Sequence, residues 1–223
     1  MTKRLLIVAA LVAAPMWAEA QTCGAWSVCS ASADLAVTSG AAFPPSSYGL
    51  AITVNDASEV ILVRDNNPAN EASYWGRFYF NPNNEALVIG NRQRIFMIQD
   101  SSNTRLAVVV FRKVAGGLSL LARVWNGTTT TDNAAGIITN AWHYVTLHWV
   151  KATTPSGTDG IFQLYVDGTQ MVNLTNLATG GSPGVDYARM GVLDPLQYNG
   201  TAYTLYFDEV EERRQTNPGA YVP

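Results

Sequence analysis

Apolar and polar side chains alternate along short segments of this chain, and apolar residues almost never recur every 3.6 positions. Alternation predicts strands that bury one face, whereas the longer period would predict helices. Breakers such as "NNPAN", "TPSGTDG" and "TGGSPG" separate the segments, as turns separate strands. The pattern therefore predicts an all-β sandwich or barrel. No fixed period repeats, which disfavours a propeller or a solenoid.

Ten segments are predicted to be strands. Segment 84–90, "NEALVIG", fits either a turn or a strand, and both remain open. The predicted strands are Tyr48–Val54, Glu59–Asp65, Ser73–Phe80, Arg94–Asp100, Thr104–Lys113, Leu118–Asn126, Trp142–Val150, Ile161–Asp167, Tyr187–Leu193 and Tyr203–Arg213.

Residues 1–20 are predicted to be a signal peptide. A positive start, "MTKR", precedes an apolar run of 13 residues and the small-x-small site "AEA", which together match the export signature. The run is shorter than the ~20 residues that cross a bilayer, and a buried N-terminal helix is the alternative. We expect a secreted protein, periplasmic or extracellular or on the cell surface, without a membrane span.

Both cysteines, Cys23 and Cys29, lie just past this site. In an oxidising compartment an even number of cysteines favours a disulfide. A zinc site would need further ligands, and neither a histidine nor a third cysteine lies nearby. Residues 21–33 are therefore expected to form an N-terminal segment stapled by a disulfide.

The composition fits one sizeable core, because 48% of the 223 residues are hydrophobic. Only 14% are charged, below the roughly 25% usual in soluble domains, and the net charge is −3. The arginine pairs Arg92/Arg94 and Arg213/Arg214 are isolated in the sequence, and no basic stripe is evident. Nucleic acid is therefore not an expected partner.

Residue parity assigns each strand a core face. Side chains two positions apart share a face of a strand, and one face of several segments is uniformly apolar. The predicted core residues are Phe78, Phe80, Leu106, Val108, Val110, Leu118, Leu120, Ala122, Val124, Val145, Leu147, Trp149, Phe162, Leu164 and Val166.

The opposite parity carries rings, arginines, a histidine and a glutamine, with Trp142, Tyr144 and Thr146 among them. A plain solvent face would carry more Lys, Glu, Ser and Thr. Aromatic rings stack on sugars, and forked donors bind hydroxyls or carboxylates, so this face is predicted to bind glycan. Alternatively, half of these side chains form a second core layer or lie under loops. The predicted ligand-binding residues are Trp75, Arg77, Tyr79, Arg105, Arg123, Trp125, His148, Gln163 and Tyr165.

Six segments resemble the bacterial laminin-G-like jelly rolls of the concanavalin A-like lectin/glucanase superfamily. They are "SYGLAITV", "VRDNNPANEASYWGRFYF", "AWHYVTLHWVKA", "GIFQLYVDGTQM", "YARMGVL" and "TLYFDEVEERR". The resemblance implies a two-sheet antiparallel jelly-roll β-sandwich over residues 34–214, followed by a C-terminal tail, 215–223. Such folds host lectins, adhesion modules, hydrolases and lyases, so fold alone does not select a function.

The resemblance also implies roles for single residues. The Asp-Gly of "VDG", residues 167 and 168, is expected to form a turn. Trp142 is expected to anchor the sandwich edge, and His143 to be a structural histidine. Many relatives hold a structural Ca²⁺, which points to Asp208 in "YFDEV" as a metal ligand.

Two catalytic chemistries were compared with these residues. Hydrolysis needs paired carboxylates, but Glu209 and Glu211 lack the glucanase pattern Glu-x-Asp-x-x-Glu. Elimination from a uronate needs carboxylate neutralisation, a base and a proton donor. Arg77, Arg123 and Gln163 would serve the first task. His148, Tyr144 and Tyr165 are the catalytic candidates for the other two.

The sequence therefore favours an exported carbohydrate-binding or adhesion module that recognises glycan on a curved sheet face. The first alternative, and the enzyme that the residues favour over a hydrolase, is a polysaccharide lyase acting on acidic glycans. The second alternative is a structural surface protein without a small ligand. Apart from the possible calcium ion, no cofactor is expected.

Overall fold

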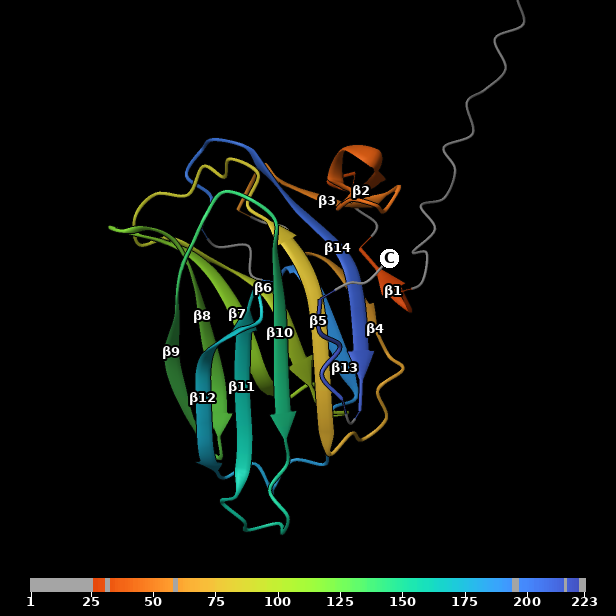
Figure 1. Cartoon of the computed structure of the whole chain (residues 1–223), viewed down its shortest axis with the longest axis vertical. Coiled ribbons are helices and arrows are strands. Elements are labelled where there is room, and N and C mark those ends of the chain that lie inside the picture. Colours follow the sequence, from red (N-terminus) through yellow and green to blue (C-terminus); the bar gives the residue numbers. More distant parts are fainter. Residues whose placement is uncertain (1–25, 31–32, 58–59, 194–196, 215, 221–223) are drawn as a thin grey trace, which may run out of the picture.

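The computed structural model describes residues 26–30, 33–57, 60–193, 197–214 and 216–220. Within these ranges, fourteen strands form two antiparallel sheets of seven strands each, and one short 3-10 helix, η1 (Ser39–Ala41), accompanies them. The sheets pack face to face (Figure 1). The predicted two-sheet jelly-roll sandwich is confirmed.

Sheet A is the rear sheet in Figure 1. In spatial order its strands are β1 (Val28–Cys29), β4 (Ile61–Asp65), β13 (Tyr187–Val192), β6 (Arg92–Gln99), β7 (Arg105–Val114), β8 (Gly117–Asn126) and β9 (Thr129–Ile138).

Sheet B is the front sheet in the same view. In spatial order its strands are β12 (Thr169–Leu177), β11 (Gly160–Val166), β10 (His143–Val150), β5 (Ser73–Asn81), β14 (Tyr203–Arg213), β3 (Gly49–Val54) and β2 (Leu35–Thr38). Strands β5, β10 and β11 carry six of the nine predicted ligand-binding residues.

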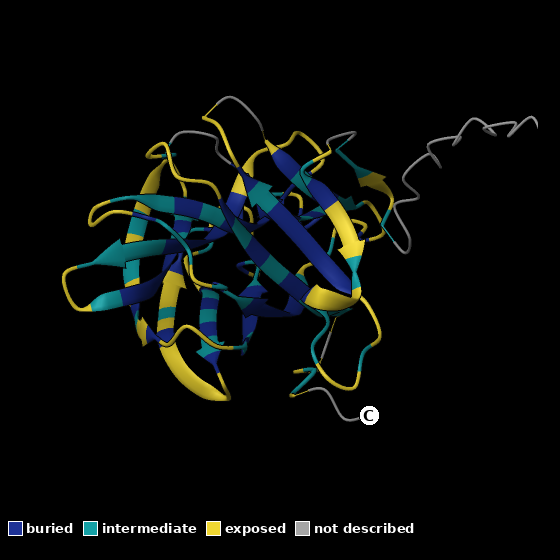
Figure 2. Cartoon of the chain, turned by 90° about the horizontal axis from the view of Figure 1, so that it is seen from above, coloured by how far each residue is buried: buried dark blue, intermediate teal, exposed yellow. Residues whose placement is uncertain are grey.

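The core lies between the sheets, where side chains of alternate parity meet. Phe78 stacks on Phe96 across the two layers at a centroid distance of 4.8 Å, and Trp149 is fully buried. Figure 2 shows buried residues along the strands and exposed residues in loops and strand ends. Burying large apolar side chains in this way contributes about 1.5–3 kcal/mol for each.

The second and third strands of the β10–β11–β12 meander are joined by the predicted Asp-Gly turn. Asp167 and Gly168 have φ values of +51° and +80°, as a two-residue type I′ hairpin requires. The Asp167 carboxylate also bonds His143 Nδ1 at 2.6 Å and accepts from the Tyr144 backbone N–H at 3.0 Å. His143 therefore ties the start of β10 to the end of β11, in a structural role.

Four strands were not expected, and all four lie at sheet edges: β1 and β9 in sheet A, and β2 and β12 in sheet B. The two long ones are β9, residues 129–138, and β12, residues 169–177. Edge strands have one partner and keep polar side chains, so they lack the apolar face that marks a central strand. Segment 84–90 forms no strand.

Parity failed on β7, where Val108 and Val110 had been assigned to the core. The pairing of β7 with β6 passes from Ala107 opposite Ile98 to Arg105 opposite Gln99, so Leu106 is an extra residue on β7, and such bulges shift the faces of a strand. Val109 and Phe111 point into the main core instead. Val108 and Val110 belong to a separate small cluster on the outer face of sheet A.

The predicted signal peptide, 1–20, lies outside the described residues, as does Cys23, so export and the disulfide to Cys29 stay predictions. In the part of the chain that is described, no helix is long and apolar enough to cross a membrane.

Candidate active site on the outer face of sheet B

Strand register brings outward side chains of sheet B into rows. Trp75, His148 and Gln163 are direct cross-strand partners on β5, β10 and β11, and Asn173 of β12 extends the row. Two positions along, Arg77, Thr146 and Tyr165 form a second row. A third row pairs Tyr79 with Tyr144. We call the first two rows, with Gln170 opposite Tyr165, the polar ladder.

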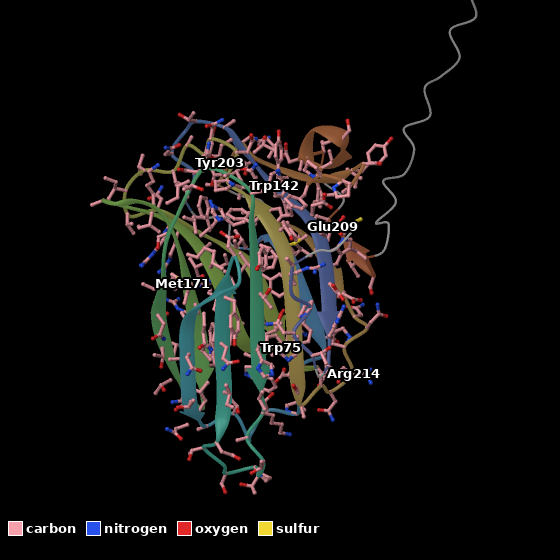
Figure 3. The ribbon with its side chains drawn as sticks, in the orientation of Figure 1. Trp75, Trp142, Met171, Tyr203, Glu209 and Arg214 are labelled. Atoms are coloured by element: carbon pink, nitrogen blue, oxygen red, sulfur yellow. The ribbon has the colours of Figure 1, made fainter. Side chains whose placement is uncertain are left out.

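Trp75 and His148 form the floor of the ladder. Their rings stack at a centroid distance of 3.9 Å and an interplanar angle of 6°, and the Tyr165 ring lies 6.1 Å from the indole. Figure 3 shows Trp75 on the lower half of the front sheet and Trp142 near its upper end. The stack fixes the imidazole plane, because rotation would break the ring contact.

Hydrogen bonds decide which ring nitrogen carries the hydrogen in neutral His148. Tyr165 O–H donates to Gln163 Oε1 at 3.1 Å, so Oε1 faces the ladder as an acceptor. His148 Nδ1 lies 3.2 Å from the same oxygen and must donate to it, because a carbonyl oxygen only accepts. The lone pair is therefore on Nε2, which Ser73 Oγ approaches at 3.3 Å.

The outer strand β12 completes the network. Gln170 Nε2 donates to the Tyr165 hydroxyl at 3.1 Å, and Gln163 Nε2 donates to Asn173 Oδ1 at 3.2 Å. Ser73, Gln170 and Asn173 were not among the predicted site residues. Polar side chains of these types are common on any surface, and β12 itself had not been predicted as a strand.

The surroundings perturb two titratable groups. Burial lowers the pKa of His148, and the Gln163 bond offsets part of this effect. A neutral imidazole at physiological pH is the form that accepts a proton. Burial, then Asp167 and Tyr79, raise the pKa of Tyr144. Tyr144 therefore stays protonated and holds its proton more firmly than an ordinary tyrosine.

Arg77 is outward-facing but covered. Its side chain is only 4% exposed and pairs with Glu211 of β14 at 3.0 Å. Arg77 Nη1 also donates to the Gly219 carbonyl at 3.2 Å. The C-terminal segment, described over residues 216–220, thus lies on the side chain that was predicted to face a ligand.

Tyr79 is covered as well. Phe43, in the chain between η1 and β3, places its ring 4.1 Å from Tyr79 and 5.7 Å from Trp142. Trp142 therefore packs against the upper end of the sandwich, in line with its predicted anchoring role. The alternative that half of the aromatic face lies beneath other segments holds for this end of the sheet.

Arg105, Arg123 and Trp125 are on the other sheet. Arg105 lies on β7, and Arg123 and Trp125 lie on β8, where Arg123 Nε and Nη2 each donate to Asp132 at 2.6 Å. The single predicted face is thus wrong: it is divided between opposite sides of the molecule. Parity tells which side chains of one strand lie on the same face, but not which sheet the strand joins.

Both carboxylate oxygens of Asp208 accept hydrogen bonds from the backbone. Its Oδ2 accepts from the Phe43 backbone N–H at 2.7 Å and its Oδ1 from the Glu209 backbone N–H at 2.8 Å. Across the described ranges, no group of three or more His, Cys, Asp or Glu side chains is placed to hold a metal. Calcium also takes backbone carbonyl oxygens, so the calcium site stays a prediction, which a chelator-induced fall in melting temperature would support.

A cavity of about 510 Å³ lies away from the ladder. It opens at the edge of the sandwich, between β1 and β4 of one sheet and β2, β3 and β14 of the other, and its lining includes Asp65 and Glu212. Burial, and then the charge of Asp65, raise the pKa of Glu212 to about 7. The ladder itself is an open sheet face, which suits a polymeric ligand better than a small enclosed one.

Solved structures with this fold include several lyases. The endo-beta-1,4-glucuronan lyase from the fungus Trichoderma reesei superposes with a TM-score of 0.63 at 14% identity, covering 85% of this chain and 91% of that one. A mutant of alginate lyase Aly36B in complex with alginate trisaccharide gives 0.61 at 11% identity, covering 76% and 84%. Alginate lyase vAL-1 from Chlorella virus gives 0.58 at 11% identity, covering 81% and 88%.

At such low identity these likenesses show the fold, which is a concanavalin A-like sandwich; the laminin-G-like subtype is not confirmed. A search of curated proteins found no match. The sequence itself, however, matches the model of one enzyme family over residues 34–211. Most of the chain is covered, including every strand of the ladder. The chain therefore belongs to the polysaccharide lyase family.

Proposed function

We propose that this protein is an exported lyase that cleaves an acidic, uronate-containing polysaccharide by β-elimination on the polar ladder. The observation that carries the proposal is the His148–Gln163–Tyr165 arrangement, in which one amide oxygen orients both a neutral base and a phenol. Family membership supports elimination over the binding module that the sequence favoured.

The proposed chemistry assigns the proton transfers to two side chains. His148 Nε2 takes the proton on C5 of the uronate, after leaving Ser73. The electron pair of that C–H bond forms the C4–C5 double bond, and the C4–O4 bond breaks. Tyr165 gives its phenolic proton to the departing oxygen. The amide of Gln163 positions both groups, and Trp75 fixes the imidazole plane and offers an indole near the sugar.

Charge stabilisation of the uronate is the remaining requirement. A carboxylate flanking the abstracted proton must be neutralised for the anion to form. Gln170 and Asn173, both exposed at the edge of the ladder, supply amide donors. Arg77 supplies a guanidinium one row away once the C-terminal segment leaves it.

Tyr165→Phe is the most informative variant because it removes one hydroxyl. We expect kcat on a polyuronate to fall by about 10²–10⁴-fold, the usual contribution of general acid–base catalysis. Ultraviolet absorbance of the unsaturated product measures the rate. Tyr206→Phe, on the outer face of the same sheet but opposite Asn81, is the matched control and should keep full activity.

Tyr144→Phe separates the two candidate donors. Tyr144 lies outside the polar ladder, in the row of Tyr79, and burial raises its pKa, so we expect a smaller loss than for Tyr165→Phe. Equal turnover by wild type and Tyr165→Phe would contradict the assignment. Binding of polyuronate with no product from the wild type would instead support the carbohydrate-binding alternative.

A further inference from the structure

The cavity at the open edge of the sandwich combines carboxylates with apolar side chains. It lies where β14 of the front sheet passes β4 and β13 of the rear sheet, on the right of Figure 1. Among the described residues, Asp65, Asp208, Glu209 and Glu212 line it and no Lys, Arg or His does. A smaller cavity, of about 210 Å³, shares Asp65 and Glu212 with it. We call the two together the acidic cavity.

Three acceptors line the smaller part of the acidic cavity, on Asp65, Tyr74 and Glu212. Tyr74 is only 2% exposed, and neither its hydroxyl nor Glu212 Oε1 has a hydrogen-bond partner among the described residues. Asp65 Oδ1 accepts from Ser27 Oγ at 3.1 Å and from the Asn67 N–H at 2.9 Å, which leaves Oδ2 for a ligand. Buried polar groups normally have partners, so these atoms indicate a site whose ligand brings the donors.

The two shared carboxylates lack a counter-charge. The basic residues at the smaller part of the cavity are paired elsewhere: Arg213 with Glu211, and Arg214 with Glu71 at 2.8 Å. In the part of the chain that is described, neither shared carboxylate takes part in an ion pair. Buried charges are normally paired, so a cation is the ligand that this cavity lacks.

The electrostatics of the cavity agree with this view. Burial, and then the charge of Asp65, raise the pKa of Glu212 to about 7. Burial, and then the charge of Glu212, raise the pKa of Tyr74, so its hydroxyl stays neutral and keeps its lone pairs as acceptors. A bound cation would relieve the repulsion between the two carboxylates.

The larger part of the cavity has an apolar wall from both sheets. Val63 of β4 and Met190 of β13 come from sheet A, and Leu50 of β3 and Phe207 of β14 come from sheet B. All four are buried, and Trp26 packs against the same core from the N-terminal side. A short hydrocarbon chain is favourably buried on such a wall. The ligand is therefore expected to have a cationic end and an aliphatic end.

We propose that the acidic cavity binds a small aliphatic amine, with the ammonium on Glu212, Tyr74 and Asp65 and the hydrocarbon chain along the apolar wall. An ammonium has three donors and no acceptor, which matches three acceptors. Calcium would need six to eight oxygens, and no group of three or more His, Cys, Asp or Glu side chains in the described ranges is placed to hold a metal. The site is separate from the polar ladder and does not depend on the proposed function.

Calorimetric titration with n-pentylamine tests the site. It is done at pH 8, above the Glu212 pKa of about 7, with EDTA present to exclude metal ions. We expect Glu212→Gln to bind at least about tenfold more weakly than the wild type, because the amide carries no charge. Tyr74→Phe should bind several-fold more weakly and still fold, because the lost hydroxyl has no partner in the described chain. Asp159→Asn, which neutralises an exposed carboxylate outside the cavity, is the control and should bind like the wild type.

Related probes separate the contributions of charge, donors and chain. Pentanol has the same chain without the charge, and tetramethylammonium has the charge without donors. We expect each to bind at least about tenfold more weakly than n-pentylamine. Nα-acetyl-lysine methylamide presents the same ammonium on a lysine side chain. If it binds more tightly than n-pentylamine, the site is supported and its natural ligand is a lysine side chain rather than a free amine.

Three results would overturn the proposal. The first is equal affinity of the wild type and Glu212→Gln for n-pentylamine, or no binding by either. The second is equal binding of pentanol, which would make the cavity merely apolar. The third is tighter binding of calcium ions than of n-pentylamine in buffer without EDTA, with loss of that binding in Glu212→Gln. Should Glu212→Gln fail to fold, Tyr74→Phe takes its place in the same comparisons.

Discussion

A single amide oxygen decides the chemistry available at the residue scale. Gln163 Oε1 accepts from Tyr165 and thereby forces His148 to donate through Nδ1. The base nitrogen then faces away from Gln163. Burial beside Trp75 lowers the pKa of His148, since a charged imidazole loses hydration there. Side-chain packing, and no nearby charge, keeps this histidine neutral.

This state can be checked without any substrate. The chain has two histidines, so a His143→Gln variant assigns their NMR signals. We expect His148 to titrate below the ordinary histidine value of about 6.5. Gln163→Leu should lower its pKa further, because the bond to Gln163 favours the charged form. Titration of His148 at or above the ordinary value would remove the argument for a neutral base.

At the scale of elements, the C-terminal segment and β14 control access to Arg77. Strand β14 bulges between Asp208 and Glu211, with Glu209 at φ +47°, which sets Glu211 opposite Arg77. The segment after β14 then returns over the sheet and places the Gly219 carbonyl on the guanidinium. The Arg77 guanidinium is thus paired and hydrogen-bonded within its own chain.

Deleting residues 215–223 should uncover Arg77. One hydrogen bond to a charged group is lost, and its net contribution of about 1.5–3 kcal/mol would become available to a uronate. We expect KM for alginate to fall by roughly fivefold or more, with kcat little changed. Asn217→Ala, which removes the hydrogen bond that the Gly219 N–H donates to Asn217 Oδ1, should give a smaller change in the same direction. A rise in KM on deletion would show that the segment helps to form the site.

At the scale of the whole molecule, a cavity separates the two sheets at the edge where β1 and β4 lie opposite β2, β3 and β14. Glu212 extends into the gap between them near Asp65 and Tyr74, and burial raises its pKa to about 7 from a usual 4.5. The folded state thus favours the protonated carboxyl. A raised acid pKa contributes stability that is complete below pH 4.5 and is lost as pH rises towards 7.

Glu212→Gln should remove this pH dependence. We expect the free energy of unfolding of the wild type to fall, relative to the variant, by up to about 3 kcal/mol between pH 4.5 and pH 8. Urea unfolding at several pH values measures it. Asp159→Asn is the control: it changes a fully exposed group whose pKa is lowered, outside this window. Parallel stability curves for wild type and Glu212→Gln would contradict the expectation.

Prediction from sequence succeeded where a local signal existed. Alternation found the ten central strands. The Asp-Gly pair predicted the β11–β12 turn, because these residue types adopt the positive φ values that the turn has. Prediction failed where the structure of a segment depends on the strands that pair with it. The polar edge strands β9 and β12 carry too little apolar surface to be recognised, and Val108 changes face because of a bulge that no composition reveals.

The sequence by itself determined an all-β sandwich and its core residues on most strands, and it placed the candidate residues His148, Gln163 and Tyr165 on non-core faces, because period-two alternation is a property of each strand alone. Only the tertiary structure decided which of these types meet. Antiparallel register joined His148 to Gln163 and separated both from Arg123. The same register converted arginines scattered from position 64 to position 189 into one face, because neighbours in a sheet are set by strand order and not by distance along the chain.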